Sequence, residues 1–418
     1  MKFDNIEPYE HQISIAKSAY EILKLFGFVY LAMEERTGKT LTSLLVVQKC
    51  NKSFIKKVLV VSKLKALPDW QFWLDYYKHR LSIQDSHPVE FKLVNFESLH
   101  KVDFLPDLMI IDEAHHCLSG YPTVGKAYKQ LKRLGEIVPI ICLSATPSAQ
   151  SYSSLYQQLS ISVYQPFYKY RNFYDWFREY GIPKTQHLGM KSVPVYTDTK
   201  VEMIKAVQDN YFISYSRKNL GFKREPEDVI HYIALGGDRL NTLKYARKNK
   251  VLPLKMLGFD KEDEILLESA SKELSILHQL EGGTIKGPKQ DYFLSVQPKI
   301  DYIKDQFGDT DRIAIFYHFV AEGLLLKQHF KHAKILQSVS HAEGIDLSHL
   351  DTCIIYSMNY SASKYLQRRA RMCNLKRDKE IQVHYLLCKG LISEAVYQTV
   401  AVEKRNFTSS YYDKLNLF

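Results

Sequence analysis

The sequence lacks the features that mark secreted, disulfide-bonded or membrane-spanning proteins. Only six of its 418 residues are cysteines, and no pair of them has the C-x-x-C spacing of zinc or redox sites. Most lie in apolar runs, which is typical of reduced core cysteines in a cytoplasmic protein. No apolar run reaches the roughly 18 residues of a membrane-spanning helix, and the first residues, MKFDN, include no apolar signal region. We therefore expect a soluble, cytoplasmic protein with no membrane partner.

Clustered metal ligands and repeats are also missing. His115 and His116 have no companion ligands at metal-binding spacing, so a zinc site is not expected. No internal repeat, coiled-coil heptad or low-complexity tract stands out. The length of 418 residues is nevertheless enough for two or three domains with substantial cores.

What the sequence has in excess is positive charge. It contains 57 Lys and Arg residues against 46 Asp and Glu, a formal net charge of +11. This balance favours a polyanionic partner, although many soluble proteins without a nucleic-acid role share it. The aromatic content of 13% offers rings that could stack on bases, but ordinary core packing explains it equally well.

An apolar run that ends in acids is the first candidate site. Residues 108–111 (LMII) are typical of a parallel strand buried on both faces. Asp112, Glu113 and His115 follow directly, at the carboxyl end of a strand, where ligands bind in α/β sheets. Asp112 would then ligate a nucleotide-bound Mg²⁺, and Glu113 would polarise the attacking water. A strand that ends in acids is common by itself, so this interpretation depends on a second motif upstream.

That second motif is a candidate phosphate-binding loop. Thr37, Gly38, Lys39 and Thr40 separate an apolar stretch from a helix-compatible one. In a strand–loop–helix unit, the N–H groups of the loop and of the helix N-terminus face the phosphates. Lys39 would reach the β and γ oxygens, and the Thr40 hydroxyl would ligate Mg²⁺. The tripeptide alone also fits a surface loop; together with the acid pair it indicates a nucleoside triphosphatase that uses ATP and Mg²⁺.

The pattern of strand-like and helix-like segments changes twice along the sequence. Residues 1–160 alternate strand-like and helix-like segments, as does the region 296–418, and both are typical of doubly wound α/β domains. Between them, residues 161–295 show mainly helical periods, which predicts a helical insert. The expected strands are residues 28–32, 57–62, 91–95, 108–111 and 139–144 in the first region, and 312–317, 334–337, 352–356 and 382–387 in the last.

The order of motifs resembles that of superfamily-2 helicases, and within them Swi/Snf-type DNA translocases and compact phage-encoded DEAD/DEAH-box relatives. The resemblance covers both α/β regions and implies two RecA-like domains, an ATP-binding domain at 1–160 and a second domain with a closing helix at 296–418. The segments that carry it are PYEHQ (8–12), LAMEERTGKT (31–40), VLVVSKLKALPDW (58–70), NFESL (95–99), DEAH (112–115), SATP (144–147), IAIFYHF (313–319), EGIDL (343–347), QRRAR (367–371) and the tail 383–404.

The resemblance also implies roles for further residues. Gln12 would read the adenine, and Gly344 and Asp346 would contact the nucleotide from the second domain. Ser144 and Thr146 would couple hydrolysis to DNA contact. Arg371, supported by Arg368, would reach the γ-phosphate as an arginine finger. The residues implied in DNA backbone contact are Lys63, Asn95 and Ser98.

Two departures from the family pattern bear on the rate of hydrolysis. Met33 stands where the phosphate loop usually has its first glycine, and Arg36 occupies a position where a small residue is usual. Asn374 stands where the family often has the last arginine of its finger motif. We expect these changes to slow turnover without abolishing it.

The sequence therefore predicts an ATP-dependent DNA translocase or helicase that acts in replication, recombination or repair. Its partners would be duplex or branched DNA, contacted through the backbone, and phage or host replication and recombination proteins in the bacterial cytoplasm. Three alternatives stay open: an RNA helicase, the motor subunit of a restriction-type complex, and a nucleotide-gated DNA clamp with weak hydrolysis.

Overall fold

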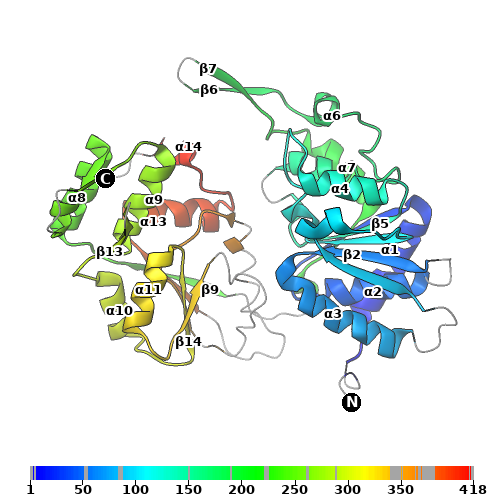
Figure 1. Ribbon diagram of the computed structural model, residues 1–418, viewed down its shortest axis with the longest axis horizontal. Helices are drawn as coiled ribbons and strands as arrows, with labels where there is room; N and C mark the ends of the chain where they lie inside the picture. The colour runs from blue at the N-terminus through cyan, green and yellow to red at the C-terminus, as the bar shows by residue number, and fades with distance from the viewer. Residues whose placement is uncertain are drawn as a thin grey trace. The chain divides into compact units, whose positions relative to one another are not determined.

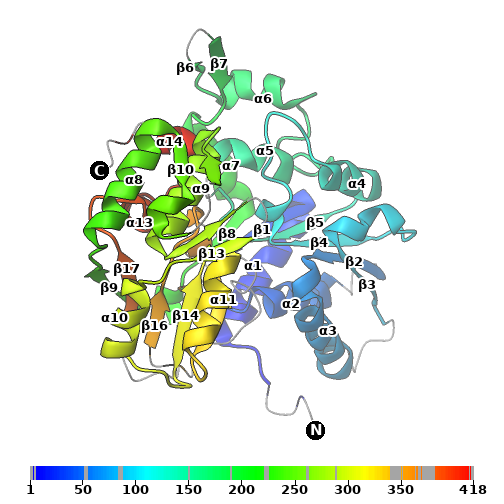
Figure 2. The ribbon, with the colours of Figure 1, turned by 60° about the vertical axis from the view of Figure 1, so that its left-hand side comes forward.

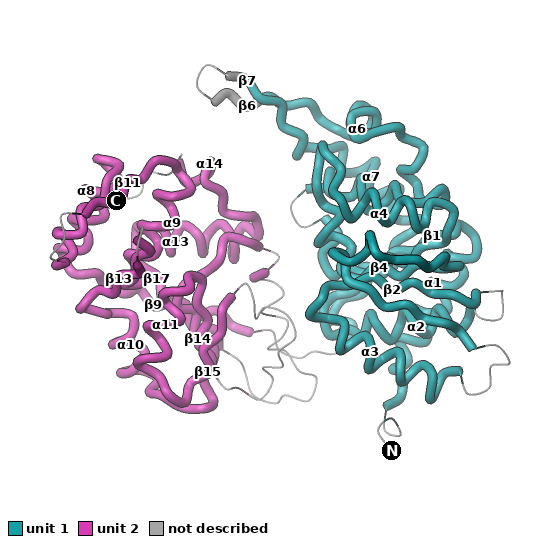
Figure 3. Tube along the Cα trace, in the orientation of Figure 1, with its two compact units in different colours: residues 1–221 teal, residues 222–418 magenta. Residues whose placement is uncertain are grey.

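The computed structural model of the protein describes residues 3, 6–50, 55–82, 88–148, 151–188, 191–220, 226–259, 263–287, 290–338, 350, 352–362, 364–365, 369, 382–413 and 415. The chain divides into two compact units, residues 1–221 and 222–418 (Figure 3). Each unit contains its own parallel β-sheet, so the protein is of the α/β class.

The first unit is built on a six-stranded sheet (Figure 1). Its strand order is β3-β2-β4-β5-β1-β8, and all six strands are labelled in Figure 2. Every neighbouring pair in this sheet is parallel. Its strands are β1 (Phe28–Met33), β2 (Lys57–Ser62), β3 (Glu90–Asn95), β4 (Leu108–Asp112), β5 (Ile140–Leu143) and β8 (Phe212–Tyr215). Its helices are α1 (Glu10–Phe26), α2 (Lys39–Cys50), α3 (Leu67–Tyr76), α4 (Lys126–Gly135), α5 (Leu155–Gln158), α6 (Phe173–Tyr180) and α7 (Val201–Tyr211). A two-stranded hairpin, β6 (Lys184–Leu188) and β7 (Lys191–Val195), completes the unit.

Helices cover both faces of this sheet, and the strand sequences explain why. Successive side chains of a strand point to opposite faces. Phe28 and Tyr30 of β1 accordingly pack with α4, whereas Val29 and Leu31 pack with α1 and α2. In Figure 2, α1, α2 and α3 lie on one side of the sheet and α4 on the other. Strands buried on both faces must be apolar throughout, which is why they were visible in the sequence.

The second unit has a five-stranded sheet with the order β15-β14-β16-β17-β9, again parallel at every pairing. Its strands are β9 (Glu227–Tyr232), β14 (Ile313–Tyr317), β15 (Lys334–Gln337), β16 (Thr352–Ile355) and β17 (Gln382–Leu387). Two small antiparallel pairs accompany it: β10 (Val251–Pro253) with β11 (Glu264–Leu266), and β12 (Thr284–Lys286) with β13 (Asp291–Phe293). The helices are α8 (Gly237–Asn249), α9 (Ala270–Glu281), α10 (Pro298–Gln306), α11 (Val320–His329), α13 (Ile392–Tyr397) and α14 (Ser409–Tyr412).

The stretch 161–295, expected to form a separate helical insert, is instead divided between the two units. Strand β8 extends the first sheet beside β1, and β9 extends the second beside β17. Both are edge strands with half-exposed residues, so neither carries the apolar run that identifies a central strand. The aromatic residues of this stretch pack into the core of the first unit: Phe167, Phe173, Trp176 and Phe177 are all buried there.

The strands expected from the sequence agree closely with those of the structure. Each of the nine expected strands is present, with both ends within one residue of the prediction. Within the part of the chain that the structure describes, no helix is both long and apolar enough to span a membrane.

Candidate functional site

The candidate residues of the first unit meet at one edge of its sheet. Strands β1, β2, β4 and β5 are parallel, so their carboxyl ends lie at the same edge. The loop before Lys39 follows β1, Lys63 follows β2, Glu113 follows β4, and Ser144 follows β5. This edge is where α/β sheets bind ligands.

The segment between β1 and α2 forms a tight loop around a buried lysine. Lys39 is 9% exposed, and its Nζ donates a hydrogen bond to the carbonyl oxygen of Met33 at 3.0 Å. Gly38 has φ +84° and Arg36 has φ +63°, so the loop turns through two left-handed residues. Met33 contributes its backbone while its side chain is buried in the core. Met33 replaces the usual glycine at a position where the side chain packs into the core and only the backbone faces the loop.

Gln12 holds this loop against the start of α1. Its Oε1 accepts a hydrogen bond from Tyr9 N at 2.8 Å, and its Nε2 donates to Gly38 O at 3.2 Å. The side chain is 2% exposed and fills the space beside Gly38, where an added Cβ would lie 1.9 Å from Gln12 Nε2. The neighbouring His11 contacts the carbonyl of Thr37 at 3.0 Å. Gln12 thus fixes the loop against the start of α1.

Asp112 is held by two donors that the sequence analysis did not single out. Its Oδ2 accepts hydrogen bonds from Ser62 Oγ at 2.7 Å and from Trp70 Nε1 at 2.8 Å. Burial is the main cause that raises the pKa of Asp112, and the Glu113 charge adds to it. The two hydrogen bonds and the Lys39 charge lower the pKa in opposition. Ser62 and Trp70 both lie in the segment 58–70, which the resemblance associates with DNA contact, so their link to Asp112 could be seen only in three dimensions.

Glu113 and Ser144 are joined through His115. Glu113 has the left-handed φ of +48°, a conformation that costs energy in residues other than glycine and is concentrated at functional sites. Its Oε2 lies 3.3 Å from His115 Nδ1, and the same nitrogen lies 2.7 Å from Ser144 Oγ. Ser144 Oγ also accepts from Thr146 N at 3.0 Å. A continuous chain of contacts therefore connects the loops after β4 and β5.

The residues proposed to contact DNA lie beside this site. Ser62 and Asn95 are register partners in β2 and β3, so Lys63 and the turn after Asn95 start from the same edge. Asn95 Nδ2 donates to Glu97 Oε2 at 3.0 Å, and Ser98 lies half-buried in the short helical turn Phe96–Lys101.

All four candidate site residues of the second unit lie outside the described residues, as does Asn374: they are Gly344, Asp346, Arg368 and Arg371. The neighbouring Arg369 is described. It pairs with Asp228 of β9 and donates a hydrogen bond to Pro226 O. Asp228 Oδ2 also accepts from Tyr365 at 3.0 Å and Tyr397 at 3.2 Å. Arg369 is therefore held against strand β9 of its own unit. The sequence did not indicate that Asp228 has this role.

The donor set of the first unit is chemically compatible with a magnesium nucleotide. The recorded partner of the buried Lys39 ammonium is a neutral carbonyl, so its charge is available to an anion. Within the described residues, no group of three or more His, Cys, Asp and Glu side chains is arranged to hold a metal ion by itself. Thr40 and Asp112 would supply the few protein oxygens that Mg²⁺ needs when phosphates supply the others. No protein-family model matches the chain.

Proposed function

We propose that this protein is an ATP-dependent DNA translocase or helicase of superfamily 2, and that its two parallel-sheet units are RecA-like motor domains. The observation that carries the proposal is the convergence of Lys39, Asp112 and Glu113 at the carboxyl edge of the first sheet. The order of motifs along the sequence supports it further.

In this proposal each residue has a defined task. Lys39 binds the β and γ oxygens of ATP, and Gln12 reads the adenine while it holds the loop. Thr40 and Asp112 would hold Mg²⁺, and the ion would offset negative charge on the phosphates. Glu113 accepts the proton of the attacking water.

The contacts of His115 couple the residue that activates water to the residues that are proposed to respond to DNA. A change at Glu113 alters the charge beside His115 Nδ1, and His115 contacts Ser144, which in turn holds Thr146. Arg371, supported by Arg368, completes the site from the second unit as charge develops on the γ-phosphate. DNA is held through its backbone by Lys63, Asn95 and Ser98, which requires no base recognition.

Phosphate release tests the assignment directly. The wild type, Lys39→Ala and Glu113→Gln are assayed with malachite green, without nucleic acid and with single-stranded, duplex, forked and RNA ligands. Lys39→Ala should lower turnover by roughly 10²-fold, about 3 kcal/mol in the barrier. Glu113→Gln should lower it by roughly 10²- to 10⁴-fold while ATP still binds.

Lys49→Ala is the matched control, because Lys49 lies on the same helix at its other end. Near-normal turnover in Lys39→Ala would sink the assignment. ATP-dependent DNA binding by a wild type that does not hydrolyse ATP would favour the clamp instead.

A further inference from the structure

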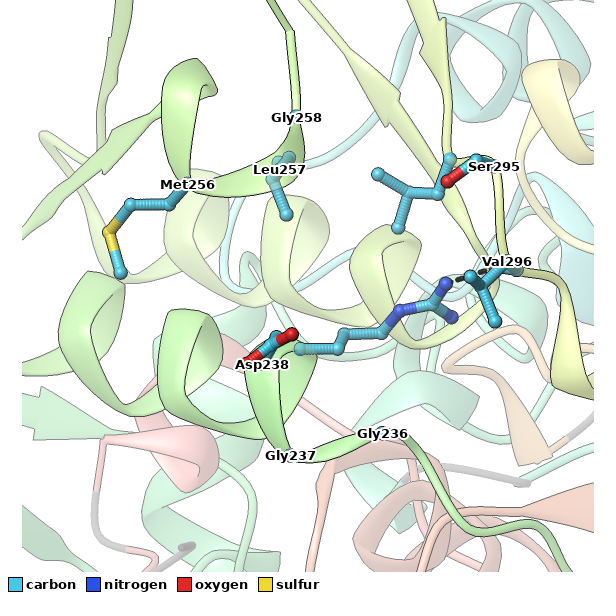
Figure 4. A pocket seen from close by; sticks show the side chains of 10 residues that line it. Gly236, Gly237, Asp238, Met256, Leu257, Gly258, Ser295 and Val296 are labelled. Carbon is cyan, nitrogen blue, oxygen red and sulfur yellow. Dashed lines mark hydrogen bonds between the residues drawn. The ribbon is translucent and has the colours of Figure 1, made fainter.

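A second candidate ligand site lies wholly within the second unit. A pocket of about 290 Å³ opens where the chain leaves β9 and enters α8 (Figure 4). It is lined by the start of α8 at Gly236 and Gly237 and by Ser295 and Val296. The pocket lies at the carboxyl end of a parallel strand, the position at which α/β folds bind ligands.

A buried guanidinium lines this pocket without an anionic partner. Arg239 is only 8% exposed. Its Nη2 donates to the carbonyl oxygen of Val296, the contact drawn as a dashed line in Figure 4. Its Nη1 is buried and has no hydrogen-bond partner among the described residues, nor does any described carboxylate pair with it. Leaving a buried charge unpaired is costly, so the site favours an anion.

The ionisable groups that act most on Arg239 do not supply that anion. They are Tyr356 and Cys388. Burial raises the pKa of Cys388 to about 12 and the pKa of Tyr356 well above its usual value, so both are neutral near pH 7.

The start of α8 offers additional donors to the same space. The first N–H groups of a helix have no partner within the helix, and they carry partial positive charge. The N-cap residue is Gly236, and no side chain caps this helix. A Cβ added at Gly236 or Gly237 would meet nothing within 4 Å, so the helix end faces open space. Helix N-termini of this kind bind phosphate.

We propose that this pocket binds the phosphate group of a phosphomonoester, with Arg239 and the N-terminus of α8 as its anion contacts. The hydroxyl of Ser295 can supply a further hydrogen bond, and Leu257 and Leu294 provide an apolar wall that excludes water. The volume suits a phosphate with a small attached group. This pocket shares no residue with the proposed ATP site.

The carboxylate of Asp238 repels a bound phosphate and so weakens its binding. This carboxylate also lines the pocket, but the residue is exposed, so water screens its charge more than that of Arg239. Asp238→Asn should therefore increase phosphate affinity.

Hydrogen–deuterium exchange, read on the peptide that spans residues 233–245, tests the proposal in the full-length protein. Inorganic phosphate is compared with chloride at equal ionic strength. Phosphate should slow exchange of this peptide about threefold or more in the wild type. The effect should vanish in Arg239→Gln and persist in Lys244→Gln, which removes an exposed charge from the same helix. Because the readout is local, phosphate bound near Lys39 does not interfere with it.

A second variant keeps the test decisive if Arg239→Gln folds poorly. Gly236→Asp places a carboxylate at the N-cap, where asparagine and aspartate stabilise helices and where the structure has room. It should slow exchange without phosphate and abolish the response to phosphate. No phosphate effect in the wild type, or an undiminished effect in Arg239→Gln or in Gly236→Asp, would overturn the proposal.

The same assay identifies the source of the phosphate. Glycerol 3-phosphate is compared with a 5′-phosphorylated DNA strand and with the same strand carrying a 5′-hydroxyl. Stronger protection by either phosphomonoester than by inorganic phosphate supports the site and shows which kind of molecule supplies the phosphate group. Equal protection by the 5′-hydroxyl and 5′-phosphate strands contradicts a phosphomonoester site.

Discussion

At the scale of single residues, Asp112 combines burial with two neutral hydrogen-bond donors. Trp70 is 1% exposed and Ser62 is fully buried, so both donors are fixed by packing. Both bonds go to Oδ2, which orients the carboxyl group. A carboxylate positioned in this way would need no rearrangement to ligate Mg²⁺.

Trp70→Phe tests this positioning. An aromatic ring is kept, although it is smaller, and the N–H donor is lost, so Asp112 should be oriented less well. We expect ATPase to fall roughly 10-fold and the Mg²⁺ concentration for half-maximal rate to rise, because outer-shell partners of metal ligands have effects of about this size. Trp73→Phe is the control, since Trp73 lies on the same helix and packs against Phe72 and Tyr76. An unchanged Mg²⁺ dependence in Trp70→Phe would limit Trp70 to a structural role.

At the scale of elements, the sequence predicted every central strand of the two sheets and the edge strands β3 and β15, but not the edge strands β8 and β9. Residues 58–61 and 108–111 are continuous apolar runs because helices cover both faces of their sheet, and such runs can be recognised without a structure. Edge strands β8 and β9 contain polar residues, so their sequences do not differ clearly from those of the flanking segments. The contacts of Asp112 with Ser62 and Trp70 span 50 and 42 residues, so no local pattern could reveal them.

The edge strand β9 supplies an anchor for the arginine motif. Asp228 binds Arg369, and the proposed finger Arg371 lies two residues further along the sequence. Asp228→Asn removes the charge that holds Arg369, so we expect DNA-stimulated ATPase to fall roughly 10-fold with little change in ATP affinity. Glu227→Gln, an exposed neighbour in β9, is the control. Equal rates for the two variants would mean that Arg369 does not position the motif.

A pair of histidines links β9 to β17 and predicts acid sensitivity. His231 Nε2 lies 2.9 Å from His384 Nδ1, and Tyr302 Oη lies 2.7 Å from His231 Nδ1. Burial lowers the pKa of His384 to about 4, and the His231 charge adds to this effect. Because an unfolded histidine titrates near pH 6.5, the folded protein takes up this proton less readily than the unfolded chain.

The contribution of His384 to the free energy of unfolding is therefore fully present above about pH 6.5. It is lost as the pH falls from there toward about 4. His384 accounts for at most about 3 kcal/mol of this loss. Thermal unfolding followed by circular dichroism at pH 7.5 and pH 5 should show a lower melting temperature at the acid pH, and His384→Asn should reduce the difference. A variant with the full wild-type pH dependence would contradict this assignment.

At the scale of the whole molecule, net charge and the buried aromatics bear on what the proposed motor does to DNA. The formal charge of +11 favours contact with a polyanion without any base recognition. A strand-separating wedge needs exposed aromatic rings, yet Phe167, Trp176 and Phe177 are at most 6% exposed in the core of the first unit. These rings therefore stabilise the fold and are not available to split base pairs.

We accordingly expect movement along duplex or branched DNA with weak unwinding of a simple fork. ATPase should respond to duplex at least as strongly as to single strands, because the proposed contacts are made to the backbone. That response should fall steeply between about 50 and 200 mM salt, since released counterions drive phosphate contacts. Phosphate release over a salt series and displacement of a labelled strand measure the two properties. Robust unwinding of long duplex, with ATPase stimulated only by single strands, would show that the protein separates strands by elements other than these buried aromatics.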